Sequence, residues 1–300
     1  MNFARIAYRL VRYSGLPFLF REVLFRRATR IAVFHDPGPR EFERALVYLR
    51  DRYNIVSLAD HLSGRPLPPK PLVITLDDGH IGNYALLPLI RRTGIRPTMF
   101  LCAGVVGTNR RFWFLHAAMH GSSDGLKTVS DDERLRVLAT TGFTPEREFP
   151  VPQALTKAHI EEMADHVDFQ AHGVFHPCLP NCPDEVAEEE VAGPKRILEP
   201  ITGAPVTAFA YPNGDYCPRD IELLQSFGYT CGLTVDHGFN RPTDDPFKLK
   251  RLSVDDTGNL DALSVKASGV WAILTAIIAR RRLSGFKAQP MPHTVPAIAA

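Results

Sequence analysis

Two short groups of polar residues, each directly after an apolar run, carry side chains that could bind a metal ion. The first is Thr-Leu-Asp-Asp-Gly-His at positions 75–80, and the second holds His172 and His176 after the run 167–171. Two histidines and one carboxylate make an open metal site, because a coordination position remains for water. A second carboxylate beside that site could accept the proton of the water. These residues therefore predict a metal-dependent hydrolase.

Each group also has a simpler interpretation when taken alone. Asp77-Asp78-Gly79 could be an ordinary turn, and histidines four residues apart could lie on an exposed helix face. Their joint placement at strand ends favours a functional site, with Asp78 as the carboxylate ligand. His172 and His176 can converge on one metal if their segment forms a helical turn. Neighbouring Asp side chains diverge on an extended strand, so the turn at Gly79 must bring both into one site.

From residue 31 onward, short apolar runs alternate with helical stretches, which predicts parallel strands joined by helices. The expected strands are Ile31–His35, Ile55–Leu58, Leu72–Leu76, Thr98–Cys102, Val167–Ala171, Ala208–Tyr211, Thr230–Val235 and Leu249–Val254. The expected helices are Arg40–Arg52, Tyr84–Thr93, Lys157–His166, Asp184–Ile201 and Pro218–Phe227. The polar groups fall at the carboxyl ends of strands, where a β/α barrel has its active site. We therefore predict an α/β fold, a distorted β/α barrel of about seven strands. A doubly wound sheet is the alternative, but no glycine-rich phosphate loop follows a strand.

The sequence divides into three expected parts. Residues 31–260 form the barrel, and within them 107–152 form an insertion over its mouth that carries substrate contacts. Residues 1–30 precede the barrel as basic amphipathic helices, the first of them at Phe3–Tyr13. Residues 261–300 follow as an apolar helix and a disordered Pro/Ala-rich tail.

Charge is distributed unevenly along the chain. Residues 1–30 carry a charge of +6 and residues 280–300 a charge of +4, whereas residues 31–279 between them carry −8, which together give the net charge of +2. The acidic middle argues against nucleic acid as a partner, while the basic N-terminal helix fits an anionic membrane surface or, alternatively, packs on the barrel. The first segment lacks the features of a secretory signal, and the five cysteines form no CxxC pair. These observations predict a cytoplasmic enzyme or one bound peripherally to the inner membrane, and leave its oligomeric state open.

Together with a third motif, the two groups resemble the polysaccharide deacetylase family, the fourth carbohydrate esterase family. The third motif is Phe-Ala-Tyr-Pro-Asn-Gly at 209–214, and the resemblance covers residues 31–256. It implies an amide hydrolase that removes acetyl groups from N-acetylated sugars, with a glycan as partner and a divalent metal, usually zinc, as cofactor. It also implies that Asp77 is the general base and that the backbone N–H of Asn213 helps to hold the developing oxyanion. The implied metal ligands are Asp78, His172 and His176.

The resemblance also has departures. Gly173 stands where the family usually has Ser or Thr, Leu76 where it usually has Phe, and Ala210 where many members have the Arg that orients the catalytic Asp. Arg251 stands where the family often has the His that acts as general acid, and arginine does not release a proton near neutral pH. His237 or His35 could take that role, or water could protonate the leaving amine. Candidate groove residues are His35, His80, Tyr211, Pro212, His237 and Arg251.

Two other functions are compatible with the same residues. A non-haem iron oxygenase also uses two histidines and one carboxylate. A non-catalytic glycan-binding module could keep the barrel after losing the general acid. The second Asp and the Pro212 motif favour hydrolysis over both.

Overall fold

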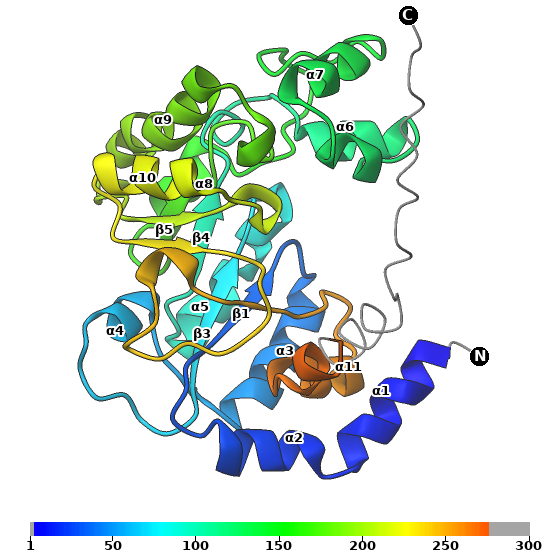
Figure 1. Ribbon diagram of the computed structural model, residues 1–300, viewed down its shortest axis with the longest axis vertical. Helices are drawn as coiled ribbons and strands as arrows, with labels where there is room; N and C mark the ends of the chain where they lie inside the picture. Colours follow the sequence, from blue (N-terminus) through cyan, green and yellow to red (C-terminus); the bar gives the residue numbers. More distant parts are fainter. Residues whose placement is uncertain (1–2, 276–300) are drawn as a thin grey trace, which may run out of the picture.

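Eight parallel strands form one sheet in the centre of the protein (Figure 1). They are β1 (Arg30–Phe34), β2 (Asn54–Ile55), β3 (Pro71–Leu76), β4 (Thr98–Leu101), β5 (Asp168–Ala171), β6 (Ala208–Ala210), β7 (Cys231–Leu233) and β8 (Leu252–Ser253). Their order is β7-β6-β5-β4-β3-β1-β8, and β2 pairs with the start of β3. The computed structural model describes residues 3–275.

The two edges of the sheet meet through the segment that precedes β8. Leu249 forms a parallel bridge with Leu233 of β7, and two residues after Arg251 the chain is paired with Val33 of β1. A single short segment thus contacts both edges, which closes the sheet irregularly. The predicted distorted β/α barrel is confirmed.

Helices occupy the connections between the strands. They are α3 (Pro39–Arg50), α4 (Leu58–Leu62), α5 (Leu87–Thr93), α8 (Lys157–Met163), α9 (Asp184–Thr202) and α10 (Pro218–Ser226). A further helix, α11 (Leu260–Ala267), follows the last strand. One expected boundary was wrong, because β2 ends at Ile55 and Leu58 already begins α4. Ser57 causes this early helix start: its hydroxyl accepts from the N–H of Asp60, whose carboxylate accepts from the N–H of Ser57. The expected helix at 84–93 is likewise a 3₁₀ turn, Ile81–Leu86, followed by α5.

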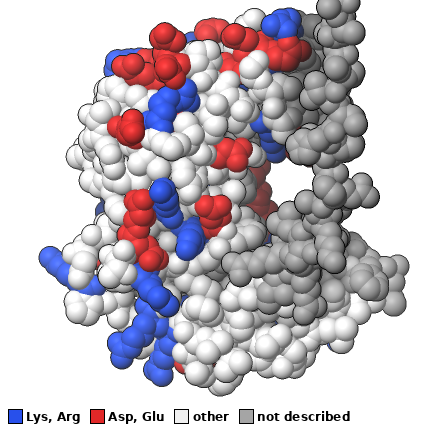
Figure 2. Space-filling view, viewed as in Figure 1, with Lys and Arg blue, Asp and Glu red and all other residues white. Residues whose placement is uncertain are grey.

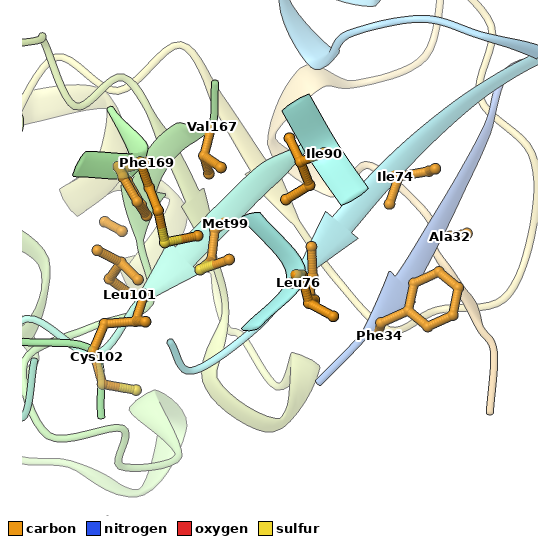
Figure 3. Packing of buried hydrophobic residues seen from close by; sticks show 14 of the residues in the cluster. Ala32, Phe34, Ile74, Leu76, Ile90, Met99, Leu101, Cys102, Val167 and Phe169 are labelled. Atoms are coloured by element: carbon orange, nitrogen blue, oxygen red, sulfur yellow. The ribbon is translucent and has the colours of Figure 1, made fainter. Parts of the chain in front are cut away.

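Alternate residues of each strand face opposite sides of the sheet. One set packs under the helices, and Figure 3 shows Phe34, Leu76 and Met99 among its members. The other set fills the barrel interior, with Val73 and Phe100 in its cluster. A residue that continues the interior series just beyond a strand end therefore points into the mouth of the barrel.

Two further parts flank the barrel. At its lower end in Figure 1 lie α1 (Phe3–Tyr13), α2 (Leu16–Leu19) and the π-helical turn η1 (Phe20–Leu24). The segment 107–152 lies at the opposite end and contains α6 (Trp113–Met119), η3 (Asp124–Lys127) and α7 (Asp131–Ala139). Within residues 3–275, no helix has the length and apolar character needed to cross a membrane. Most of the tail expected at 261–300 lies outside the described residues. The last named helix within the described residues is α11.

Candidate metal centre and active site

The mouth of the barrel holds a cavity of about 340 Å³. His35, Asp77, His172 and Arg251 line it. Each continues the interior series of its strand segment, two residues after Val33, Thr75, Gln170 or Leu249. The alternation of the strands thus brings together four polar residues that are widely separated in sequence.

Asp78, His172 and His176 form a buried group of three metal-ligating side chains. Asp78 Oδ1 lies 3.5 Å from His172 Nε2 and 3.6 Å from His176 Nε2. Two ligands bound to one zinc at tetrahedral angles lie about 3.3 Å apart, so these separations suit a single ion. The carboxylate and imidazole donors also suit zinc. The three residues therefore fit the metal that the sequence predicts.

Left-handed backbone at two ligands makes this convergence possible. Asp78 has φ of 73° and His176 has φ of 61°, a region that non-glycine residues rarely adopt. The reversal at Asp78 lets its side chain point into the same cavity as that of Asp77, although neighbouring side chains diverge on a strand. The expected helical turn between the histidines is wrong: residues 172–176 form an irregular bend with Gly173 at φ of 76°. Such strained positions cluster at functional sites.

Neighbouring groups orient the ligands from behind. His172 Nδ1 lies 2.7 Å from the carbonyl oxygen of Ala210, so it donates there and leaves Nε2 for a metal. His80 Nε2 lies 3.0 Å from Asp78 Oδ2, on the carboxylate oxygen that does not face the two histidines. His80 is thus a support of Asp78 and does not line the cavity, contrary to the expectation that it contacts substrate.

The electrostatics of the site favour the metal-binding forms of the ligands. Burial raises the pKa of Asp78, but the hydrogen bond from His80 and the nearby His176 outweigh it, and the net shift is downward. Burial and the neighbouring His172 lower the pKa of His176 to about 3. Asp78 is therefore ionised and His176 neutral at physiological pH, as metal ligation requires.

Glu190 of α9 explains why position 173 is a glycine. Its buried carboxylate accepts hydrogen bonds from the N–H groups of Val174 (2.6 Å) and Phe175 (3.0 Å). A Cβ at Gly173 would lie only 2.6 Å from Glu190 Oε2. The carboxylate thus occupies the space that a Ser or Thr would need and holds the bend between the two ligand histidines. Sequence reasoning missed Glu190, because a helical Glu in the motif Glu-Glu-Glu has no distinguishing local pattern.

Removing this support is expected to weaken metal binding. Glu190→Ala leaves two buried N–H groups without acceptors and frees the bend, so zinc affinity should fall by roughly 10–100-fold, as for other groups that orient ligands. Competition against a chromophoric chelator measures the affinity. Glu188→Ala, an exposed neighbour on α9, is the control. Unchanged zinc affinity in Glu190→Ala would show that the bend holds itself.

Asp77 is held by Arg251 at the bottom of the cavity. Its Oδ1 accepts from Arg251 Nη1 at 2.7 Å, and Arg251 Nε donates to the carbonyl of Thr234 at 2.8 Å. Both side chains are almost fully buried. Burial raises the pKa of Asp77, but the charge of Arg251 outweighs it, and the net shift is downward. The departures from the family pattern at positions 210 and 251 are therefore related. Many family members have an Arg at position 210 that orients the catalytic Asp; here position 210 is Ala, and Arg251 supplies the guanidinium instead.

The remaining predicted groove residues divide into two sets. Tyr211 and Asn213 line the cavity together with His35 and Arg251, whereas Pro212 and His237 do not. His237 lies beside the carbonyl of Arg251, with Nδ1 at 3.5 Å. Tyr211 reaches the cavity with part of its side chain, and its hydroxyl donates to the carbonyl of Phe247.

Three cavity residues come from the 107–152 segment: Phe114, Ser123 and Lys127. Phe114 also lies beside the metal ligands, with its ring centroid 5.0 Å from that of His176. The sequence indicated only that this segment would cover the mouth. Neither the spacing nor the composition of 107–152 identifies which of its side chains reach the cavity.

Comparison with known proteins agrees with this geometry. Residues 64–232 match the polysaccharide deacetylase family. Similar solved structures include IcaB from Ammonifex degensii (21% identity, TM-score 0.58, covering 79% of this chain and 97% of that one). They also include the Streptococcus pyogenes deacetylase PplD in complex with acetate (19% identity, TM-score 0.57, covering 79% of this chain and 99% of that one). A third is the BpsB deacetylase domain from Bordetella bronchiseptica (18% identity, TM-score 0.53, covering 75% of this chain and 95% of that one). A search of curated proteins finds no match.

A hydrolase with a buried Asp-His-His metal site in a β/α barrel is the class that fold and site define. The chain belongs to the polysaccharide deacetylase family and is a deacetylase, an enzyme that hydrolyses an acetyl amide. This membership decides against the oxygenase, and the complete set Asp77, Asp78, His172 and His176 argues against the non-catalytic module. Members of the family act on glycans and depend on a metal.

Proposed function

We propose that the protein removes acetyl groups from N-acetylated sugars of a polysaccharide or a lipid-linked glycan, with zinc as the metal. The observation that carries the proposal is the ionised Asp77 in the same cavity as Asp78, His172 and His176. This arrangement combines a metal site with a separate base, as amide hydrolysis by water requires.

Each residue has a distinct role in the proposed reaction. When bound, zinc would lower the pKa of a water molecule and polarise the acetyl carbonyl. Asp77 accepts the proton of the attacking water, because Arg251 engages Oδ1 and keeps the carboxylate ionised. The N–H of Asn213, in a left-handed turn with φ of 58° at the cavity wall, stabilises the oxyanion.

We further propose that His35 donates the proton to the leaving amine. It lies two residues beyond the interior residue Val33, is exposed at the mouth and lines the cavity with Asp77. Arg251 cannot serve, because it stays protonated and is paired with Asp77. His237 lies outside the cavity lining. Of the two histidines that the sequence offers for this role, the geometry therefore favours His35.

Removing this proton donor should lower turnover more than substrate binding. His35→Gln is expected to reduce kcat by roughly 10²–10⁴-fold, the usual contribution of general acid catalysis, with little change in KM. Acetate release at a series of substrate concentrations measures both constants. His237→Gln should keep the activity. The reverse pattern would assign the role to His237.

The substrate class can be tested directly. A panel of N-acetylglucosamine oligomers, O-acetylated sugars and lipid-linked N-acetyl sugars is assayed for acetate and for new free amines. Equal amounts of acetate and amine from an N-acetylated member support the proposal. Acetate without amine would indicate an O-acetyl esterase, and the panel also separates polymeric from lipid-linked substrates. Enzyme loaded with zinc, cobalt or nickel identifies the productive metal.

A further inference from the structure

Exposed apolar side chains are concentrated in the N-terminal helices. Eight of the fifteen large apolar residues exposed in the described part of the chain lie between residues 6 and 24. Leu10, Tyr13, Phe18, Val23 and Leu24 are the most open of them, with 56–71% of their surface exposed. Single exposed apolar residues are ordinary, but a concentration in one short segment indicates an interaction surface.

These residues form a ridge on a rigid support. Ile6, Leu10 and Tyr13 share one face of α1, at spacings of four and three residues. A different part of α1 packs on α11 and the residues after it: the rings of Tyr8 and Trp271 lie 5.0 Å apart, and Arg12 Nη1 lies 2.7 Å from Asp261 Oδ1. We define the ridge as the exposed apolar residues of 6–24. Its α1 part is held in place by these contacts of the same helix.

Unpaired arginines flank the ridge at both ends. Arg5 and Arg9 are exposed on α1, and Arg26 and Arg27 are exposed after η1. Within residues 3–275, none of the four lies at ion-pair distance from a carboxylate. The only acid among residues 1–30 is Glu22, which pairs with Arg21 (2.7 Å) and Lys70 (3.2 Å). Figure 2 shows a largely uncharged surface at this lower end of the molecule, with basic side chains on its left side.

Two hollows adjoin the ridge and are lined by arginine. One, of about 570 Å³, is lined by Arg5, Arg9 and Arg44 and by Ile6 of the ridge. Arg12 and Asp261, which pair with each other, also lie in its wall. The other, of about 360 Å³, combines Leu24 with Arg27 and Arg241. A guanidinium group can donate two parallel hydrogen bonds to two oxygens of one phosphate. Each hollow could therefore accept a phosphate group at the edge of an apolar surface.

We propose that the edge formed by α1, α2 and η1 docks the enzyme on an anionic phospholipid membrane. The ridge enters the headgroup region, and the flanking arginines contact lipid phosphates. A polyanion such as nucleic acid would leave the apolar ridge without a partner. A second copy of the chain would place the unpaired arginines against one another. The 107–152 segment over the active site lies at the opposite end of the molecule (Figure 1), so docking leaves the cavity open.

Full-length protein is tested by co-sedimentation with vesicles of phosphatidylcholine alone or with added phosphatidylglycerol. Wild type is expected to bind only the anionic vesicles, and more weakly at high salt. Arg5→Gln/Arg9→Gln/Arg27→Gln should lower the affinity by about 100-fold, since three basic contacts with the surface are lost. Leu10→Ser/Phe18→Ser should also lower it, without changing the charge. Acetate release from a soluble oligomer should remain unchanged in both variants, because neither set lies near the cavity.

Matched controls separate the surface from bulk properties. Arg40→Gln/Arg65→Gln/Arg96→Gln removes the same charge from other exposed positions, and Met119→Ser/Val151→Ser removes apolar residues of similar exposure. Both should bind like wild type. Equal loss in the arginine control, or no binding by wild type, would overturn the proposal. A dimer in solution that Leu10→Ser/Phe18→Ser converts to a monomer, without vesicle binding, would assign the ridge to a second copy instead.

Discussion

Replacing either histidine of the metal site, by His172→Ala or His176→Ala, is expected to abolish tight zinc binding and acetate release together. Asp78 and one histidine leave only two protein ligands, fewer than the three of catalytic zinc sites. The loss should exceed the effect of Glu190→Ala, which removes a support and not a ligand. Metal content after purification, zinc titration and acetate release measure the effect.

The control for this experiment is His166→Ala, a partly buried histidine after α8 that lies outside the cavity lining. It should keep one zinc per chain and full activity. Far-ultraviolet circular dichroism should show the same fold in all three variants, because none of the three histidines belongs to the apolar clusters of the barrel core. Wild-type zinc content in either His172→Ala or His176→Ala would refute the assignment of ligands.

Most elements of the fold are visible in the sequence because buried parallel strands and amphipathic helices have strong patterns. The helix Phe3–Tyr13 has the expected bounds, and every expected strand occurs at least in part. The exception at Ile55–Leu58 is informative. Its apolar residues fit a strand, but the capping box of Ser57 and Asp60 starts a helix there. A local hydrogen-bond pattern overrode a short apolar run.

The grouping of site residues was predictable for a physical reason. Asp77 and His172 lie just past buried strands of one parallel sheet, whose carboxyl ends meet at the same edge. The motifs and the predicted fold therefore both placed the active site at the carboxyl edge of the sheet. The bend that aligns His172 with His176 was not predictable, because it depends on left-handed backbone at His176 and on Glu190 from a different helix.

Arg251 shows what a local motif conceals. In the sequence it appeared as the loss of a general acid, because only its position relative to the family pattern could be compared. Its contact with Asp77 joins residues 174 positions apart, through the segment that closes the barrel. Such a substitution at a distance can be identified only once the strands are arranged in space.

Asp77→Asn is expected to keep zinc and lose most turnover. The amide is isosteric and can still accept the hydrogen bond of Arg251 through its oxygen, but it cannot take a proton from water. A loss of roughly 10²–10⁴-fold in kcat is typical for removal of a general base. The change also leaves Arg251 buried without a counter-charge, so the free energy of unfolding should fall by about 3–5 kcal/mol.

The assay for Asp77→Asn is therefore run below its measured Tm, with zinc content determined on the same sample. Asp78→Asn is the matched variant, because it alters the adjacent carboxylate by the same chemistry. It should lose zinc, whereas Asp77→Asn should not, and this contrast separates a base from a ligand. If Asp77→Asn remains active while Asp78→Asn keeps its zinc, the two aspartates have been assigned the wrong roles. A folded, zinc-loaded and inactive Asp77→Asn enzyme identifies Asp77 as the group that accepts the proton, since the metal and the cavity are then unchanged.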